Sequence, residues 1–249
     1  MGEGSVEFAK VSYTLPSSAV LLRDISLRLE PGTVTALLGR SGSGKTTLLR
    51  MVNGLVRPTA GEVLVSGRVV EDDGLIELRR GIGYVIQESG LFPHMTVARN
   101  VGIAMELAGR SEGEMAARVG EVLALAGIDA VEFGGRYPWQ LSGGQRQRVG
   151  LARALAMGAP VLLMDEPFGA LDPLTRAEMQ TMLKKLLQAV QKTVLLVTHD
   201  LDEALYLAER VVFLEAGVVV ADLAADEVLR STLPQVREYV AAVHRVVSS

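Results

Sequence analysis

The chain has 249 residues, of which 49% are hydrophobic, so its length suits one large domain or two small ones with a substantial core. The formal net charge of −4 and the pI near 5.5 show no basic footprint, so we expect no nucleic-acid partner. The absence of cysteine excludes disulfides and thiolate metal sites.

The N-terminus does not read as a signal peptide, because no basic segment leads into an apolar stretch. Mean hydropathy is positive at +0.28, yet charge or glycine interrupts every apolar run well before the ~18 residues that a spanning helix requires. We therefore expect the protein to stay where it is made and to associate with a membrane only through a partner.

The first part of the chain is predicted to be mostly strand. Residues 5–30 alternate between apolar and polar side chains, and residues 33–38 form a short apolar run typical of a buried strand. Residues 46–54 have helical periodicity and end in Asn-Gly. Further short strands are expected within residues 59–67 and 81–87.

Helical spacing begins at Val97 and continues to about Gly127, with Thr96 as a candidate N-cap. The elements expected after it are a helix at 145–157, a strand at 160–166, a helix at 173–191, a strand at 193–198, a helix at 200–210 and one or two amphipathic helices from Asp222. Strands that alternate with helices predict a mostly parallel sheet covered on both faces.

A glycine-rich segment between the strand at 33–38 and the helix at 46–54 fits the pattern G-x-x-x-x-G-K-[ST]. In this pattern backbone N–H groups surround phosphates, a lysine reaches the outer phosphates and a hydroxyl binds magnesium. The alternative is a glycine-rich turn with an incidental lysine. The predicted phosphate-binding residues are Gly39, Arg40, Ser41, Gly42, Ser43, Gly44, Lys45, Thr46 and Thr47.

Two acids, Asp165 and Glu166, end a predicted core strand. Ligands of α/β sheets bind beyond the carboxyl ends of the strands, so we expect both carboxylates near Lys45 and Thr46. Asp165 is suited to the magnesium shell and Glu166 to polarising a water that attacks the γ-phosphate. The alternative is that they are N-cap and surface residues before a turn.

Several further motifs appear in a fixed order along the chain. Gln87 and His199 each follow a predicted strand, and the remaining motifs are Leu141-Ser142-Gly143-Gly144-Gln145, Val161 to Glu166 and Ala170-Leu171-Asp172. Together with Gly39 to Thr47 they resemble, in order and spacing, the complete motif set of the ATPase subunits of ABC transporters. The resemblance covers residues 5 to 220. It identifies the motifs as Walker A, Q-loop, signature, Walker B, D-loop and switch histidine.

The resemblance implies an α/β fold of the P-loop NTPase class, RecA-like, with a mostly parallel core sheet, an N-terminal antiparallel β part and an inserted α-helical subdomain. It implies a single domain over residues 1–249. The expected parts are an ATP-binding core at 1–88 and 158–220, a helical subdomain carrying the signature at 89–157, and a short helical tail at 221–249.

The resemblance also implies roles for individual residues. The implied cofactors are ATP and Mg²⁺, with Glu166, His199 and Lys45 as catalytic residues. The implied magnesium ligands are Thr46, Gln87 and Asp165, the last through a water. Tyr13 falls where this family stacks an aromatic ring on adenine, although a lone tyrosine also serves as packing.

In this family each nucleotide lies between the Walker motifs of one subunit and the signature of another. The implied assembly is a head-to-tail homodimer. The residues expected to act on the partner's nucleotide are Ser142, Gly143, Gly144, Gln145 and Asp172.

Residues 78–87, 90–97 and 166–176 are similar to importer ATPases for glycine betaine, choline and related osmoprotectants. This implies an ATP-hydrolysing subunit that powers uptake of a small solute, lies on the cytoplasmic side of the membrane and works with permease subunits and a solute-binding protein. The permeases would contact about residues 88–97. In such importers this segment lines a groove that receives a helix of the permease. Phe92 and Met95 either line this groove or belong to the core.

Two departures from the osmoprotectant type stand out. About 30 tail residues follow the ATPase motifs, so tandem regulatory modules are not expected, and Glu88-Ser89 and Trp139 are unusual at their positions. An exporter or lipid-transport ATPase remains the alternative. A DNA-repair ATPase would carry a long coiled coil between its motifs, and the interval here is too short for one. A translation factor of the ABC type would carry two ATPase units in one chain, and this sequence contains one motif set.

Overall fold

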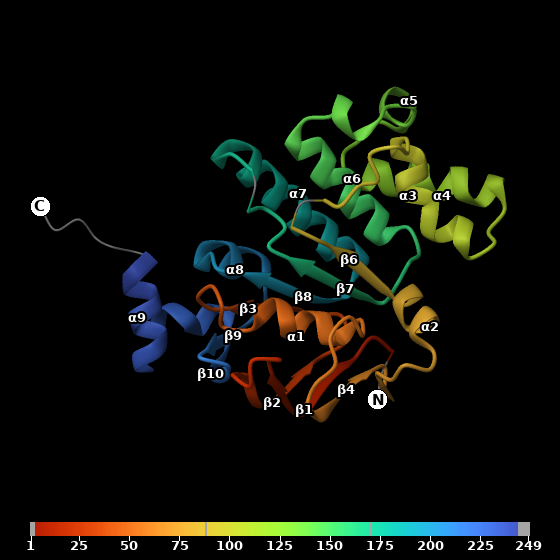
Figure 1. Ribbon diagram of the computed structural model, residues 1–249. Helices are drawn as coiled ribbons and strands as arrows, with labels where there is room; N and C mark the ends of the chain where they lie inside the picture. Colours follow the sequence, from red (N-terminus) through yellow and green to blue (C-terminus); the bar gives the residue numbers. More distant parts are fainter. Residues whose placement is uncertain (1–2, 88, 170, 244–249) are drawn as a thin grey trace, which may run out of the picture. The chain divides into compact units, whose positions relative to one another are not determined.

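A computed structural model describes residues 3–87, 89–169 and 171–243 (Figure 1). The chain divides into two compact units. The first combines residues 1–73 with 193–249, and the second comprises residues 74–192. The expected helical subdomain at 89–157 falls within the second unit.

The first unit contains a four-stranded antiparallel sheet with the strand order β2-β1-β4-β5. In β2, Ile25, Leu27 and Leu29 are buried while the residues between them are exposed, which is the period of two expected for a half-buried strand. The strands are β1 (Val6–Thr14), β2 (Val20–Leu29), β4 (Ala60–Val65) and β5 (Arg68–Val69).

A second sheet of this unit runs in the order β10-β9-β3-β8. Strand β3 (Val34–Leu38) lies parallel to both β8 (Thr193–Thr198) and β9 (Arg210–Glu215), and β10 (Val218–Ala224) is antiparallel to β9. All residues of β3 and β8 are buried, as is typical of parallel strands covered on both faces.

Helix α1 (Lys45–Val52) contacts both β4 and β8, so it lies between the two sheets of the first unit (Figure 1). Its side chains Leu48, Leu49, Met51 and Val52 are buried there. The rest of the unit comprises α8 (Leu201–Leu207), η2 (Ala225–Arg230) and α9 (Pro234–Val243).

Two expectations for this region are wrong. The helix predicted at 200–210 ends at Leu207 and Arg210 begins β9, while Asp222 lies in β10 rather than in a tail helix. The cause is tertiary, because the chain from Arg210 pairs with β3 and Arg210 Nε donates to Asp222 Oδ1 at 2.6 Å across the hairpin. The tail helices η2 and α9 follow this hairpin.

The second unit contains a parallel strand pair and most of the helices. Strands β6 (Ile82–Val85) and β7 (Val161–Asp165) are parallel, and α6 contacts α3, α4, α7 and β6. The helices are α2 (Leu75–Arg80), α3 (Val97–Leu107), α4 (Glu112–Leu125), α5 (Ala130–Phe133), η1 (Pro138–Gln140), α6 (Gly143–Leu155) and α7 (Pro173–Val190).

Thr96 is the N-cap of α3, as expected, and accepts a hydrogen bond from Arg99 N at 3.4 Å. Helix α2 was not expected. Helix α6 begins two residues before the predicted start, because Ser142 and Gln145 form a capping box that outweighs the poor helix propensity of the intervening glycines. Together, the parallel pairings, the antiparallel sheet and the helices confirm the α/β fold class.

None of the helices in the described ranges is sufficiently long and apolar to cross a membrane.

The contact between β6 and α6 gives a stability test. A Cβ atom on Gly83 would lie 2.4 Å from the carbonyl oxygen of Ala154. We expect Gly83→Ala to lower the free energy of unfolding by ~1–3 kcal/mol, measured by urea denaturation, because the backbone must move to make room for the methyl group.

Gly120→Ala is the matched control, since a Cβ on this helical glycine would meet nothing within 4 Å. It is expected to stabilise α4 by ~0.5–1 kcal/mol. Equal stability of Gly83→Ala and the wild-type protein would contradict the close packing of β6 on α6.

Candidate active site

The phosphate loop joins the end of β3 to the start of α1. Gly44 is the N-cap residue of α1, with φ of 100° in the left-handed region that favours glycine. Gly44 has no side chain with which to cap the helix, so the first-turn N–H groups of α1 are presented to a ligand at this end. Such a helix N-terminus is an anion-binding site.

Gly39 allows the loop to pass very close to β9. A Cβ atom at this position would lie 2.2 Å from the carbonyl oxygen of Leu214 and 2.9 Å from Ser43 Oγ. Any side chain there would push the loop away from the sheet. The first glycine of the motif is therefore required by packing.

Lys45 and Ser43 place polar groups inside the loop. The Lys45 side chain is buried, and its Nζ donates to Gly39 O at 2.7 Å and to Arg40 O at 2.9 Å. Ser43 is also buried, and its Oγ has no hydrogen-bond partner among the described residues. A buried ammonium, an unsatisfied hydroxyl and a helix N-terminus together fit a phosphate group.

Tyr13 lies on the face of the antiparallel sheet that adjoins the phosphate loop. Tyr13 of β1 pairs with Leu22 of β2, and residues paired directly opposite place their side chains on the same face. Leu22 Cδ2 lies 2.5 Å from the position of a Cβ on Gly44. This placement is compatible with adenine stacking, which remains a prediction.

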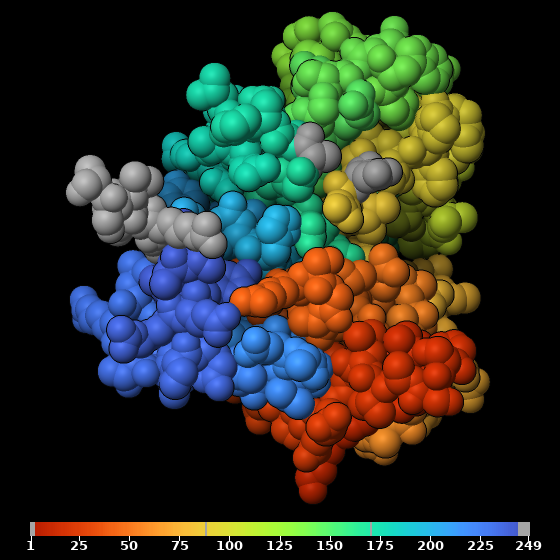
Figure 2. Space-filling view, turned by 60° about the vertical axis from the view of Figure 1, so that its left-hand side comes forward, coloured from red at the N-terminus to blue at the C-terminus, as the bar shows by residue number. Residues whose placement is uncertain are grey.

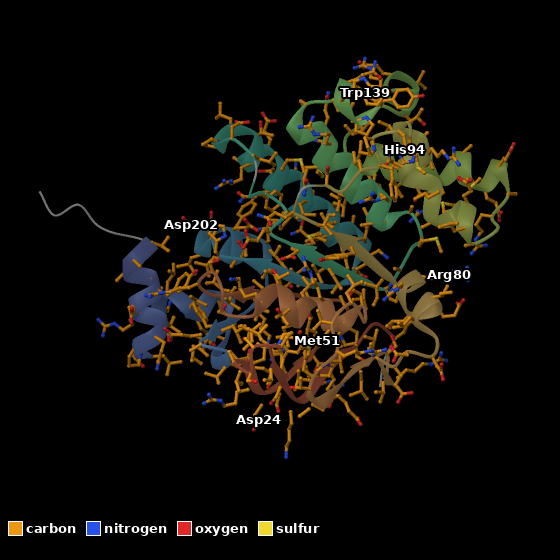
Figure 3. The ribbon with its side chains drawn as sticks, viewed as in Figure 1. Asp24, Met51, Arg80, His94, Trp139 and Asp202 are labelled. Carbon is orange, nitrogen blue, oxygen red and sulfur yellow. The ribbon has the colours of Figure 1, made fainter. Side chains whose placement is uncertain are left out.

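His199 follows β8, the neighbour of β3 in the sheet. Leu38 pairs with Thr198, so Gly39 and His199 leave adjacent strand ends within the first unit. Asp200 N donates to Thr198 Oγ1 at 3.0 Å, and Asp200 caps α8, whose first turn holds the Asp202 labelled in Figure 3. The structure thus brings His199 to the edge of the sheet that carries the Walker A loop.

The second unit brings Gln87, Asp165 and Glu166 together. Val85 of β6 pairs with Met164 of β7, so the chain leaves both strands at the same edge. Asp165 is buried. Gln87 Nε2 and Glu166 Oε2 each lie 3.8 Å from the position of a Cβ on Gly169, so the amide and the carboxylate flank the same glycine.

Glu166 adopts a left-handed backbone conformation with φ of 45°. This conformation is uncommon for a residue other than glycine, and such strain concentrates at functional sites. The turn is closed by a hydrogen bond from Gly169 N to Glu166 O at 3.2 Å. The N-cap of α7 is Asp172, so the alternative that Asp165 or Glu166 caps this helix is wrong.

The signature begins α6. Ser142 is the N-cap, its Oγ accepts from Gln145 N at 3.2 Å, and its N donates to Gln145 Oε1 at 2.8 Å. Ser142 and Gly143 are exposed. The start of α6 therefore presents N–H groups to solvent, which is the feature that anion binding requires.

The signature packs on the start of α7. A Cβ on Gly144 would lie 2.7 Å from Thr175 Cγ2, so only glycine permits this approach. Asp172 Oδ1 accepts from Thr175 N at 3.1 Å, and the hydrogen bonds from Thr175 lower the pKa of Asp172. Leu171 and Asp172 of the predicted D-loop thus adjoin the signature, while Ala170 lies outside the described residues.

The segment after Gln87 is held by two polar residues that the sequence analysis did not single out. Arg153 donates to Gly90 O at 2.7 Å and to Ser89 O at 2.8 Å. The buried Asn100 donates from Nδ2 to the carbonyl oxygens of Phe92, Met95 and Thr96 at 3.1, 3.0 and 3.1 Å. Both residues are polar positions on the otherwise apolar faces of their helices, and this pattern could have indicated them from the sequence.

Phe92 is 43% exposed, so its ring is not part of the core, whereas Met95 is half-buried. Glu88, the first residue of the predicted permease contact at 88–97, lies outside the described residues.

The family model described as ABC transporter matches residues 22–169. The chain belongs to the ABC transporter family. It is 42% identical over 96% of its length to the choline transport ATP-binding protein OpuBA of Bacillus subtilis and spans 62% of that protein. It is 46% identical over 86% of its length to the glycine betaine uptake system ATP-binding protein YehX of Escherichia coli and spans 69% of it.

A solved dimeric ATP-binding cassette, in a post-hydrolysis state with ADP and phosphate, is 36% identical to this ABC transporter chain with a TM-score of 0.79. The match covers 88% of this chain and 98% of that one. The fold is therefore that of an ABC ATP-binding cassette, which confirms the P-loop NTPase class.

Lys45 tests the phosphate loop directly. We expect Lys45→Ala to weaken ATP binding about ten- to a hundredfold, because it removes a charged donor from the buried loop. Titration with a fluorescent ATP analogue measures the effect. Lys185→Ala, which removes an exposed lysine from α7, is the control, and unchanged affinity in Lys45→Ala would contradict the site.

Proposed function

We propose that this chain is the ATP-hydrolysing subunit of an ABC importer, which powers uptake of an osmoprotectant such as choline, glycine betaine or proline betaine through partner permeases. The observation that carries the proposal is the phosphate loop, in which Lys45, Ser43 and the start of α1 fit a phosphate. Family membership supports ATP as the nucleotide.

Residues of the first unit bind the nucleotide in this proposal. The N–H groups from Gly39 to Thr47 and the Lys45 ammonium hold the phosphates, and Tyr13 stacks on the adenine. His199 contacts the γ-phosphate as hydrolysis proceeds. The positions of Gly39 and His199 after adjacent strands support this division of roles.

Magnesium is the proposed metal. Its ligands from this chain are Thr46, Gln87 and Asp165, the last through a water, and hydroxyl, amide and carboxylate oxygens are donors that Mg²⁺ prefers. The described residues contain no cluster of three His, Cys, Asp or Glu side chains that would hold a metal alone. Bound by Thr46, Gln87 and Asp165, Mg²⁺ would neutralise charge during phosphoryl transfer.

Glu166 is the proposed general base. It accepts a proton from the attacking water, and Gln87, whose amide also lies near Gly169, would help to orient that water. The strained backbone at Glu166 and the shared position of these two side chains support the assignment.

Hydrolysis is proposed to require a head-to-tail homodimer. The exposed start of α6 would bind the γ-phosphate of the partner's nucleotide through Ser142, Gly143 and Gly144, with Gln145 and Asp172 beside it. The solved cassette is dimeric, which supports the dimeric state of this proposal.

The proposed partners are membrane permeases that contact about residues 88–97 and a solute-binding protein. The exposed ring of Phe92 over a backbone pinned by Asn100 suits a docking surface. The chain would then lie peripherally on the cytoplasmic side of the membrane. Export or lipid transport is not favoured, since the relatives are named for choline transport and glycine betaine uptake.

The role of Glu166 predicts a specific defect. We expect Glu166→Gln to lower the ATPase rate about 10²- to 10⁴-fold without loss of ATP binding, because the amide cannot accept the proton. ATP should also trap the variant as a closed dimer in size-exclusion chromatography. Glu178→Gln on α7 is the exposed control, and a wild-type rate in Glu166→Gln would refute the base assignment.

The substrate prediction is tested in cells that produce this chain together with a candidate permease subunit from the same organism. Radiolabelled choline or glycine betaine should accumulate in these cells and not in cells carrying Glu166→Gln, because closure and hydrolysis drive the cycle. Accumulation of neither compound by the wild-type system, with normal ATPase activity, would rule out this substrate class.

A further inference from the structure

The tail helix α9 contacts two parts of the nucleotide site with consecutive residues. Glu238 Oε1 lies 2.9 Å from Arg40 Nη2 in the phosphate loop, and Tyr239 OH donates to the carbonyl oxygen of His199 at 2.8 Å. Figures 1 and 2 show this C-terminal segment in blue beside the orange phosphate-loop region. These residues all belong to the first unit.

The Tyr239 hydroxyl is held in position by its ring. The ring packs edge-on against Phe213, with centroids 5.8 Å apart and an interplanar angle of 78°. Phe213 of β9 pairs with Leu38 of β3, which in turn pairs with Thr198 of β8. Tyr239 is thus anchored on β9 and reaches the residue that follows β8.

The Tyr239 hydroxyl carries its proton under the conditions in which the protein works, so it can donate a hydrogen bond. Partial burial, with a smaller effect of Asp200, raises the pKa of Tyr239, while Arg40 acts in the opposite direction. A tyrosine phenol is already protonated at neutral pH, and the raised pKa extends this to more alkaline conditions. Its hydrogen bond to the carbonyl is therefore present under working conditions.

The hydrogen bond acts on the backbone from which the His199 side chain projects. His199 is exposed, and the residue that follows it is fixed in place: Asp200 N donates to Thr198 Oγ1 at 3.0 Å, and Asp200 Oδ1 accepts from Glu203 N at 3.1 Å. A donor on the carbonyl of His199 orients the peptide between these anchored residues. It thereby sets the direction in which the imidazole leaves the chain.

The ion pair between Arg40 and Glu238 has a smaller part. Both side chains are about two-thirds exposed, at 70% and 68%, so solvent screens their attraction. The pair is a second contact between α9 and the phosphate loop. The hydrogen bond from Tyr239 is the contact that reaches the proposed catalytic residue.

We propose that Tyr239 is a positioning residue for ATP hydrolysis, which orients His199 through its backbone carbonyl and makes the tail helix part of the catalytic machinery. This inference rests on the proposed function, in which His199 contacts the γ-phosphate. A purely structural role, in which Tyr239 only attaches α9 to the sheet, is the competing explanation.

Tyr239→Phe removes the hydroxyl and keeps the ring on Phe213. We expect kcat for ATP to fall about two- to tenfold, the usual effect of one hydrogen bond, with KM and nucleotide affinity unchanged and Tm lowered by no more than about 2–4 °C. Arg237→Gln, on the same helix, is the control and should retain wild-type kcat. Wild-type kcat in Tyr239→Phe, or a loss of nucleotide affinity that accounts for the lower rate, would overturn the proposal.

A double-mutant cycle shows whether Tyr239 acts through His199. In a His199→Ala background, Tyr239→Phe should cause no further loss in single-turnover hydrolysis of radiolabelled ATP, because the group that it positions is gone. An equal loss in both backgrounds would overturn the proposal. Such additivity is the result expected of a structural role.

The wild-type protein separates the two levels of inference. If it binds ATP and hydrolyses it while Tyr239→Phe behaves identically, only the role of Tyr239 is wrong. If the wild-type protein binds ATP but shows no turnover as a dimer, the proposed function fails and this inference fails with it.

Discussion

The phosphate loop can close around Lys45 only because Gly39 has no side chain that would collide with the backbone of β9. The carbonyl of Leu214 occupies that space, and the loop in turn offers the carbonyls of Gly39 and Arg40 to the lysine ammonium. A buried ammonium is costly unless it is paired or hydrogen-bonded. The tight approach thus provides the acceptors that keep Lys45 buried and charged inside the loop.

Hydrogen bonds to backbone groups also order the second unit. Helix α6 begins with the capping box of the signature, and near its other end Arg153 holds the carbonyls of Ser89 and Gly90. The same helix therefore contacts both the residues proposed to bind the partner's nucleotide and the segment proposed to meet the permease.

The tail gives the first unit a comparable connection. Helix α9 reaches the phosphate loop through Glu238 and the His199 backbone through Tyr239, at a place where three neighbouring strands end side by side. A segment far along the chain from Walker A thus contacts residues of the proposed nucleotide site.

Much of the fold and site could be predicted from sequence because the determining interactions are local. The glycine pattern around Lys45, the apolar run at 193–198, the acids at the end of β7 and the N-cap at Thr96 are all legible from neighbouring residues. The resemblance of the motifs, in order and spacing, to those of ABC ATPases added the family. The homologous proteins and the solved cassette agree with that assignment.

Tertiary structure decided what depends on residues far apart in the chain. Strand β9 replaced a predicted helix end because Arg210 pairs with β3, and Gln87 and Glu166 both approach Gly169 because β6 and β7 are parallel neighbours. Arg153 and Tyr239 find backbone carbonyls 63 and 40 residues away. Such contacts leave no periodic signal, since a carbonyl acceptor is present in every residue and only the fold determines which one a side chain reaches.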